Sequence, residues 1–459
     1  MASTQSRNRA ANPIGVRAGL LLAAVAIVGV ARAQSSQFET LFQFTGNGSP
    51  FPGSTPIANL VAGPNGVLYG TTYQGGLNNS GVIFQASKQG ATWVETVLYQ
   101  FTGAFDGANP AGPLLLNSKT GVLYGTTSFG GSSGLGTVFS LTPASSPPWR
   151  LKTLHSFSGG DGAHPSGALA LVGSTLYGTT YSGGTHGRGT VFARSLTGSN
   201  SFETLYSFGS QPSDGAIPYS GVVAVAGTSL TLYGTTLYGG ASSNCPNGCG
   251  TVFALTVVSP LPSPPPTLFS FTGLSGSSPG ATPSAGLARN KSIGVFYGTT
   301  VNGGDQNLGT VFEFNPASSS GTLTMLYSFK GGQNDGANPF GSVILYQNQK
   351  LYGTTANGGD LAACPGNGCG TVFGLQQSGA IWSSSIVYAF QNGNDEARPF
   401  AGLILGNGSL YGTTAPMAPP LPPYTVPAFS SFGTVFSVAC TKKPPCCGGC
   451  AAELPKPLH

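Results

Sequence analysis

Short apolar stretches, separated by clusters of turn-forming residues, run through almost the whole chain. In one unit they cover residues 165–171, 176–180, 189–192 and 203–208. Each stretch is rich in β-branched or aromatic residues and is bounded by Gly, Pro, Ser or Asn, which are the usual signals of a β-strand. No apolar period of 3.6 residues within the unit is long enough for a helix. The pattern therefore predicts four short strands per unit.

The unit occurs seven times. Leu-Tyr-Gly-Thr-Thr, written once with Phe in place of Leu, is followed each time by Gly-Thr-Val-Phe, which changes to Gly-Val-Ile-Phe at residues 81–84. The motif tyrosines, 53 to 64 residues apart, are Tyr69, Tyr124, Tyr177, Tyr233, Tyr297, Tyr352 and Tyr411. This spacing indicates a repeat architecture, and a β-solenoid, the alternative, usually has shorter rungs of about 20 to 30 residues. Seven units of four strands predict an all-β fold, a seven-bladed β-propeller with one unit per blade.

The two ends of the repeat array predict how the ring closes. Residues 38–44 match the fourth strand of a unit but precede any first strand. Residues 433–438 match a third strand and have no fourth strand after them. We therefore expect the N-terminal strand to complete the seventh blade, which would remove the long exposed strand edges.

The repeated motifs have structural interpretations. The motif glycines, such as Gly70 and Gly125, are expected to permit close backbone approach between converging blades. The motif Tyr and Phe side chains are expected to pack between neighbouring blades. The Thr-Thr pairs suit a half-exposed strand.

The motifs also resemble those of known families. The strand order, with a Gly-rich hairpin after the second strand, resembles kelch blades. Leu-Tyr-Gly-Thr-Thr, Gly-Gly, Gly-Thr-Val-Phe, Leu-Tyr-Ser-Phe and Asp-Gly-Ala-x-Pro look like the Gloeo/Verruco tandem repeat, the choice-of-anchor GloVer repeat, over residues 38–438. The resemblance implies a bacterial exported protein whose C-terminus varies between anchoring types, and it implies no particular activity. This chain departs from that pattern because it ends in a Cys-rich segment rather than an apolar sorting helix.

Residues 1–33 have the pattern of a secretory signal. A basic start leads into an apolar run at residues 18–30, and Ala-Arg-Ala follows, with cleavage expected after it. The run is shorter than the roughly 20 residues that span a bilayer. We therefore expect a signal peptide at 1–33, a propeller at 34–439, a Cys-rich tail at 440–459, and a secreted or cell-surface protein with no transmembrane segment in the mature chain.

Charge argues against nucleic acid as a partner. Charged residues are only 7% of the chain, against about 25% in ordinary soluble domains. The expected signal holds four of the 18 basic residues and none of the 13 acidic ones, which leaves 14 basic against 13 acidic residues in the mature chain. No basic stripe of the kind that nucleic-acid binding requires remains.

Aspartate is rare and recurs in one loop. Five of the seven aspartates occupy this loop: Asp106, Asp161, Asp214, Asp335 and Asp395. The first four stand in Asp-Gly-Ala-x-Pro and the fifth in Asp-Glu-Ala-Arg-Pro; the loop before Pro283 lacks Asp, and the one before Pro56 is too divergent to align. Each carboxylate could close an Asx-turn, or the series could bind a ligand such as Ca²⁺ or sugar hydroxyls. One Asp per blade does not gather the six to eight oxygens that Ca²⁺ takes.

Three histidines lie near the Asp161 loop. His155 replaces the usual Tyr of the Leu-Tyr-Ser-Phe strand and is expected to substitute in packing, while His164 and His186 lie in loops of adjacent strands. No metal-ligand spacing connects them. In a four-stranded meander, the Asp loop and the Gly-Gly loop after the second strand emerge on the same face. We therefore hypothesise a ligand face that carries the five Asp residues with His164 and His186.

The eight cysteines fall into two groups. Two pairs, Cys245 with Cys249 and Cys364 with Cys369, precede Gly-Thr-Val-Phe at the same point of two units. In an exported protein such pairs predict loop-closing disulfides, with metal binding as the alternative. The remaining four are Cys440, Cys446, Cys447 and Cys450. Two tail disulfides, metal binding or covalent linkage to a partner are the alternatives for this group.

The sequence favours a binding or interaction module with a cell-surface glycan or protein as partner. We predict no catalytic residue, cofactor or metal site. The alternatives are a carbohydrate-active enzyme with its site over the central channel, and a structural envelope component. An enzyme should show one unit that breaks the repeat with clustered His, Glu or Arg residues, and no unit does so.

Overall fold

The computed structural model describes residues 38–48, 51–198, 201–211, 213–258, 266–317, 321–347, 349–416 and 431–439. The chain divides into two compact units, Met1–Ser36 and Gln37–His459, and every described residue belongs to the second. The expected signal peptide and the Cys-rich tail with its four cysteines lie outside the described residues. Within the described ranges, no helix is long and apolar enough to cross a membrane.

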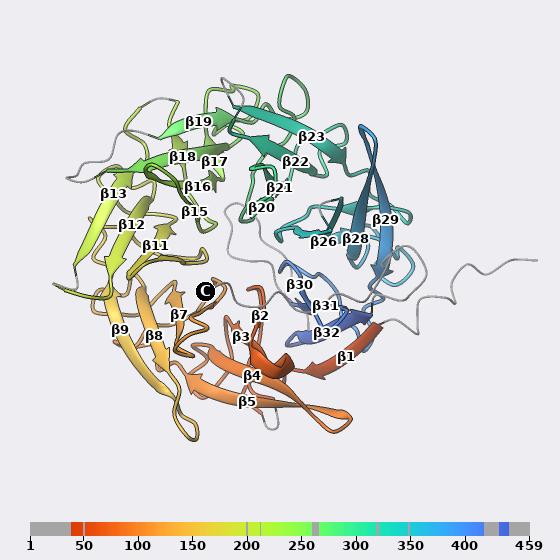
Figure 1. Cartoon of the computed structure of the whole chain (residues 1–459). Helices are drawn as coiled ribbons and strands as arrows, with labels where there is room; N and C mark the ends of the chain where they lie inside the picture. The colour runs from red at the N-terminus through yellow and green to blue at the C-terminus, as the bar shows by residue number, and fades with distance from the viewer. Residues whose placement is uncertain are drawn as a thin grey trace, which may run out of the picture. The chain divides into compact units, whose positions relative to one another are not determined.

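Seven four-stranded antiparallel sheets form the blades of a propeller, as predicted (Figure 1). Blade 1 contains β2 (Val61–Ala62), β3 (Leu68–Thr72), β4 (Val82–Gln89) and β5 (Thr92–Gln100), with a short 3-10 helix η2 (Pro64–Gly66) between β2 and β3. Blade 2 contains β6 (Leu115–Leu116), β7 (Leu123–Thr127), β8 (Thr137–Thr142) and β9 (Arg150–Ser156). Blade 3 contains β10 (Ala170–Val172), β11 (Thr175–Thr180), β12 (Thr190–Ser195) and β13 (Phe202–Ser207). Blade 4 contains β15 (Val223–Ala226), β16 (Leu230–Thr236), β18 (Thr251–Val257) and β19 (Thr267–Ser270).

The remaining blades follow the same order. Blade 5 contains β20 (Ala288–Arg289), β21 (Phe296–Thr300), β22 (Thr310–Asn315) and β23 (Thr322–Ser328). Blade 6 contains β25 (Ile344–Tyr346), β26 (Lys350–Thr355), β28 (Thr371–Ser378) and β29 (Ile381–Ala389). Blade 7 contains β30 (Ile404–Gly406), β31 (Ser409–Thr414), β32 (Thr434–Ala439) and the N-terminal β1 (Phe38–Gln43). Two small sheets join loops of one face, β14 (Gly215–Ala216) with β17 (Tyr238–Gly239) and β24 (Gly336–Ala337) with β27 (Asn357–Gly358).

The N-terminal strand closes the ring, as the sequence predicted. β1 pairs antiparallel with β32, with Phe38 opposite Val438 and Thr40 opposite Phe436, and Figure 1 shows the two ends of the array side by side. The ring of Phe38 stacks on Tyr388 of blade 6 at a centroid distance of 4.1 Å. β1 therefore completes blade 7 and also packs against its neighbour.

The motif aromatic residues pack between blades, as expected. Tyr69 of blade 1, for example, shares one buried cluster with Leu114, Leu123 and Phe139 of blade 2. Burying aromatic side chains against the next blade is the main apolar contribution to the stability of each interface.

The motif glycines have a different role from the one predicted. Gly70 lies directly opposite Phe84 of the same blade, and a Cβ on Gly70 would lie 2.4 Å from Cζ of Phe84. All seven blades repeat this pair, because the glycine of Leu-Tyr-Gly-Thr-Thr always faces the phenylalanine of Gly-Thr-Val-Phe. The glycine therefore makes room for an aromatic ring within its own blade rather than for another backbone.

The Thr-Thr pairs are buried, so the expectation of a half-exposed strand was wrong. Thr179 and Thr180 expose 2% and 0% of their surface. The Thr179 hydroxyl donates to the Ser220 carbonyl of the next blade at 2.6 Å. The Thr180 hydroxyl lies 2.8 Å from that of Thr190 in the adjacent strand. In blade 3 hydrogen bonds thus satisfy both buried hydroxyl groups, whereas the equivalent Thr71 and Thr126 hydroxyls of blades 1 and 2 have no hydrogen-bond partner among the described residues.

One buried carboxyl group breaks the repeat where blade 1 packs against blade 7. Glu95 of β5 occupies the position that holds Phe202 in blade 3 and Phe38 in β1, as the strand registers show. Both of its carboxyl oxygens, and the indole nitrogen of Trp93 two residues away, are buried without a hydrogen-bond partner among the described residues. Burial raises the pKa of Glu95 to about 8. The group is therefore largely protonated in the folded protein at neutral pH.

Glu95 should make folding stability fall as pH rises. Between its ordinary pKa of 4.5 and the folded value of about 8, the folded protein retains a proton that the unfolded chain has released. The stabilisation is fully present below pH 4.5 and is lost by about pH 8, with a slope approaching about 1.4 kcal/mol per pH unit. Urea unfolding at several pH values should show a smaller slope in Glu95→Gln than in the wild type, and Glu396, whose pKa burial also raises, keeps part of the slope in both proteins. The exposed Glu39→Gln is the control, and an unchanged slope in Glu95→Gln would contradict the assignment.

Candidate functional site: one loop face and the central channel

In blades 1 to 6, the loop that enters the blade and the Gly-Gly loop lie against each other on one face, as expected. Backbone bridges join Ala108 to Phe129 and Ala163 to Ser182. The small sheets β14–β17 and β24–β27 are the same bridge in blades 4 and 6. These backbone bonds hold the two loops in a fixed arrangement.

Each loop aspartate contacts a Tyr or His side chain of the preceding strand and accepts hydrogen bonds from nearby backbone N–H groups. Asp335, which is 7% exposed, accepts hydrogen bonds from the Tyr327 hydroxyl at 2.8 Å and from the backbone N–H groups of Lys330 at 2.9 Å and Gly336 at 2.8 Å. The Tyr or His at the equivalent position binds the loop aspartate in the other four cases: Tyr99 with Asp106, His155 with Asp161, Tyr206 with Asp214, and Tyr388 with Asp395. The aspartates thus close turns and hold the end of the preceding strand. A direct ligand-binding role for them remains a prediction.

The two units without a loop aspartate also lack the hydroxyl donor. Phe42 and Phe269 stand where the other units have Tyr or His, and Pro52 and Pro279 stand where the others have Asp. The bridge from Ser54 to Gln74 fixes the alignment of the first of these loops, which the sequence alone left open. The strand position and the loop position therefore change together: Tyr or His in the strand goes with Asp in the loop, and Phe goes with Pro.

Replacing three of the aspartates with asparagine separates the structural role from a ligand role. In Asp106→Asn/Asp161→Asn/Asp335→Asn, each amide retains one acceptor oxygen, so we expect a folded protein that is less stable by about 1 kcal/mol per site. Thermal unfolding measures this loss, and a ligand titration measures binding. Loss of binding by a variant that still folds would show that the carboxylates contact the ligand.

His164 lies beside the channel, whereas His186 does not belong to the same site. The ring of His164 stacks on Tyr181 at 5.4 Å, and its Nδ1 lies 2.8 Å from the Ser128 carbonyl oxygen. His186 is exposed on a Gly-Gly loop, and its Nδ1 lies 3.1 Å from the Thr185 hydroxyl. The structure therefore places His164 against Phe129, which packs on the residues around the channel, and places His186 next to Gly187, which lines a separate cavity between blades 3 and 4.

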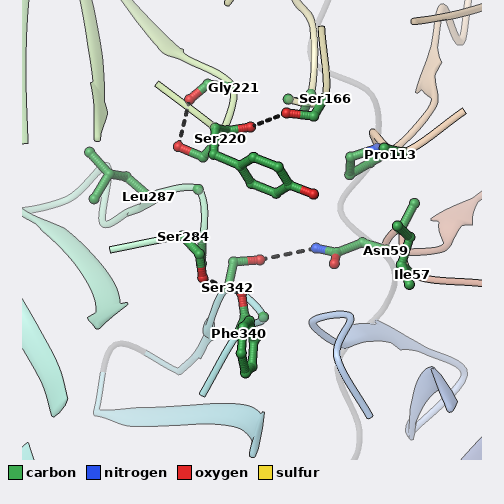
Figure 2. Close-up of a pocket in the computed structure, with 18 of the residues that line it drawn as sticks. Ile57, Asn59, Pro113, Ser166, Ser220, Gly221, Ser284, Leu287, Phe340 and Ser342 are labelled. Carbon is green, nitrogen blue, oxygen red and sulfur yellow. Dashed lines mark hydrogen bonds between the residues drawn. The ribbon is translucent and has the colours of Figure 1, made fainter. Parts of the chain in front are cut away.

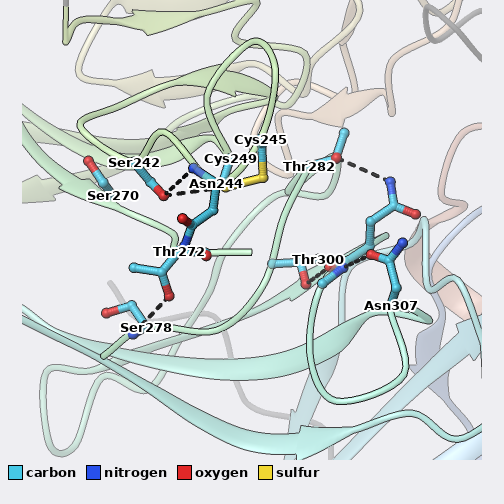
Figure 3. The surroundings of a disulfide bond; sticks show 12 residues. Ser242, Asn244, Cys245, Cys249, Ser270, Thr272, Ser278, Thr282, Thr300 and Asn307 are labelled. Carbon is cyan, nitrogen blue, oxygen red and sulfur yellow. Dashed lines mark hydrogen bonds between the residues drawn. A yellow bond between two sulfur atoms is a disulfide. The ribbon is translucent and has the colours of Figure 1, made fainter. Parts of the chain in front are cut away.

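Both predicted loop disulfides are formed. Cys245 is bonded to Cys249 and Cys364 to Cys369. Beside the first, the Asn244 side chain donates to the Thr272 carbonyl at 2.8 Å and ties the loop to the strand that leaves the blade (Figure 3). In the described part of the chain, no group of three or more His, Cys, Asp or Glu residues could hold a metal ion.

A cavity of about 230 Å³ lies in the central channel (Figure 2). Its wall is formed by the segments that follow the proline of the loop entering each blade, and all seven blades contribute to it. In blade 3 this segment was expected to be strand at residues 165–171, but β10 covers only Ala170–Val172. The residues before β10 instead contact the next blade, since the Ser166 hydroxyl donates to the Tyr219 carbonyl at 2.7 Å.

The polar groups of the wall are uncharged. Ser166, Ser220, Ser284 and Ser342 surround the pocket together with Asn59 (Figure 2). Their side chains also connect blades: Ser284 donates to the Phe340 carbonyl at 3.2 Å, and the Asn59 amide donates to the Ser342 oxygen at 3.0 Å. A serine whose proton is used in this way retains oxygen lone pairs that can accept hydrogen bonds from a ligand.

Aromatic and aliphatic side chains form the rest of the channel. We call the buried residues here the channel cluster: Ile57, Tyr73, Ala111, Leu237, Val301, Phe340, Ala356, Phe400 and Ala415. Tyr219 packs against it and lines the cavity. Burial, and then the proximity of Tyr181, raises the pKa of Tyr73 to about 12. Burial also raises the pKa of Tyr219, so both phenols are neutral hydrogen-bonding groups at physiological pH.

The residue before each loop proline fixes the rim of the channel. At this position φ is positive in all seven units, between 55° and 62°. The residues are Thr55, Asn109, His164, Ile217, Thr282, Asn338 and Arg398. Ile217, for example, donates its N–H to the Arg188 carbonyl of blade 3 at 2.9 Å and accepts from Leu237 of its own blade at 3.0 Å. A β-branched residue rarely adopts positive φ, so this double backbone contact holds the conformation.

The sequence model of the Gloeobacter/Verrucomicrobia repeat matches residues 27–245 and 236–443. The chain therefore belongs to the Gloeobacter/Verrucomicrobia repeat family, as its motifs indicated. No curated protein matches the chain.

Several solved structures are similar at low identity. One is the extracellular domain of the "putative hybrid two component system" of B. thetaiotaomicron, with 10% identity, a TM-score of 0.49, and coverage of 87% of this chain and 39% of that one. Another is the PQQ-bound aldose sugar dehydrogenase of Streptomyces coelicolor, with 11% identity, a TM-score of 0.42, and coverage of 88% and 97%. Puromycin hydrolase has 10% identity, a TM-score of 0.49, and coverage of 82% and 51%. At these TM-scores the likenesses do not bear on the function of this chain.

Proposed function

We propose that this protein is an exported binding module whose central channel holds an uncharged, hydroxyl-rich ligand such as a saccharide unit. The observation that carries the proposal is the composition of the cavity wall. All seven blades contribute to it, and its 22 residues include no Asp, Glu, His, Cys, Lys or Arg. A charged group placed in this wall would lose its hydration without gaining an opposite charge.

The wall offers the contacts that such a ligand needs. Ser166, Ser284 and Ser342 present hydroxyl oxygens, while Phe340, Phe400 and Tyr219 present apolar or amphipathic surface. Small-molecule sites commonly combine an apolar lining with a few placed polar groups of this kind. The serines are also fixed by contacts between blades, so little side-chain freedom would be lost on binding.

Export is supported by two features of the chain. The N-terminal signal pattern predicts it, and the two formed disulfides suit an oxidising compartment outside the cytoplasm. The wall contains no carboxylates, whereas most glycosidases use two, one on each side of the bond that they cleave. The geometry therefore supports binding better than hydrolysis.

Ligand-observed NMR on residues 34–459 tests the proposal. We expect saturation transfer from the protein to at least one of three neutral disaccharides: cellobiose, maltose and N,N′-diacetylchitobiose. The variant Asp106→Asn/Asp161→Asn/Asp335→Asn should retain this signal because its substitutions lie outside the cavity wall. The absence of transfer to all three sugars would contradict the proposal.

A further inference from the structure

A second, larger cavity opens beside the Cys245–Cys249 disulfide. It has a volume of about 790 Å³ and lies between the Gly-Gly loops of blades 3 and 4. We call this cavity the groove. It is lined by residues 187–188, 216–217, 238–240, 242–243 and 245–248. It lies on the same face as the Asp loops, because the β14–β17 bridge forms part of its wall.

One wall of the groove is rigid. The disulfide closes the loop, and Gly239 donates its N–H to the Asn247 carbonyl at 2.8 Å, while Gly248 donates to the Cys245 carbonyl at 3.0 Å. A Cβ on Gly248 would lie 2.2 Å from the Gly239 carbonyl oxygen, so the two backbone segments are in direct contact. A groove that is already formed binds its ligand with a smaller ordering cost.

The groove differs from the channel in charge. Arg188 is exposed and is the one charged residue among the 13 that line the groove. Among the described residues, no ion pair joins Arg188 to a carboxylate; the ion pair His155–Asp161 does not involve it. Asp214, in the loop that contributes residues 216–217 to the groove, already accepts hydrogen bonds from Tyr206, Gly209 and Gly215. Ser242, Ser243 and Asn247 add neutral polar groups to the lining of the groove.

The groove and the channel share a wall. Ile217 and Tyr238 line the groove and also pack against the channel cluster. Tyr219, two residues after Ile217, lines the channel cavity. Two residues of extended chain span about 7 Å, so along this segment the linings of the two cavities are only about 7 Å apart.

We infer that the ligand is an acidic oligosaccharide, with a neutral sugar unit in the channel and a carboxylate paired with Arg188 in the groove. The inference rests on the proposed function. A guanidinium forms strong, often bidentate hydrogen bonds with a carboxylate, and Arg188 is the cation that lines the groove. A channel without charged groups and a groove with a single cation together suit a ligand that has one acidic end.

A matched pair of sugars tests this inference by isothermal titration. Cellobiouronic acid differs from cellobiose by a carboxylate in place of one hydroxymethyl group. We expect the wild-type protein to bind the acid about tenfold more tightly at low salt. Arg188→Gln should remove this difference and leave cellobiose binding unchanged, and the distant, exposed Arg150→Gln should behave as the wild type.

The outcomes separate the two proposals. Equal binding of both sugars by the wild type, or equal weakening of both by Arg188→Gln, would overturn the role of Arg188 and leave the channel proposal standing. Binding of neither sugar, with no signal from the other neutral disaccharides, would contradict the channel proposal and this inference with it. Inorganic phosphate and glucuronate can each be tested as competitors of cellobiouronic acid. Equally strong competition by the two would show a general anion site and would also overturn the assignment to a sugar acid.

Discussion

Gly298→Ala is expected to destabilise the protein by about 3 kcal/mol or more, because the new methyl group would overpack a filled core. The added Cβ would lie 2.4 Å from Cζ of Phe312 and 3.1 Å from Leu287. Phe312 is 1% exposed and has no free space to move into. Urea unfolding should show a much lower midpoint.

Two further variants make this result specific. Gly298→Ala/Phe312→Leu removes ring atoms that the methyl group meets, so it should recover part of the lost stability. Gly286→Ala lies in the same repeat, and its Cβ would meet nothing within 4 Å; we expect a change within about 0.5 kcal/mol. Equal effects of Gly298→Ala and Gly286→Ala would show that the Gly–Phe pair is not a packing constraint.

Removal of residues 38–44 is expected to open the ring. β1 supplies the fourth strand of blade 7, and Phe42 and Phe44 are 5% and 1% exposed. Each such side chain contributes about 1.5–3 kcal/mol when buried, and the loss of the ladder would also leave the edge of β32 unpaired. Because domain stabilities are about 5–15 kcal/mol, a protein that starts at residue 45 should melt at a far lower temperature than one that starts at residue 34.

A deletion of equal length at the other end controls for chain length. Residues 453–459 lie beyond the last strand, β32, so their removal should leave the melting curve of the propeller unchanged. A melting curve that is equally unchanged after deletion of residues 38–44 would refute closure by β1 in solution.

The architecture could be predicted because the same strand motifs occur seven times in the sequence. The two strand motifs and their spacing gave the blades, and the unmatched motifs at residues 38–44 and 433–438 gave the closure. The roles of single residues within the motifs were harder to predict. The strand register is needed to see that Gly70 faces Phe84. The partner of the Thr179 hydroxyl lies in the neighbouring blade, so the sequence of one unit does not reveal it.

The contact between Tyr and Asp had a signal that sequence reasoning missed. Phe42 coincides with Pro52, and Phe269 with Pro279, in the two units that lack the aspartate. Within one chain, seven copies serve as a small alignment, and this joint change indicates a direct contact. The channel wall had no such signal, because the segments after the loop prolines read as ordinary apolar strands. Their role depends on convergence of seven blades on one axis, which local sequence does not encode.

The most direct test of the channel site is a titration, into the wild-type protein and Gly286→Phe, of the neutral disaccharide that gives saturation transfer. Gly286 lines the cavity, and its Cβ would point into open space, so a phenylalanine there should fill the channel without disturbing the blades. We expect binding to the wild type, no detectable binding to Gly286→Phe, and similar melting temperatures for both proteins. Equal affinity of the two proteins for this disaccharide would contradict a ligand site in the channel.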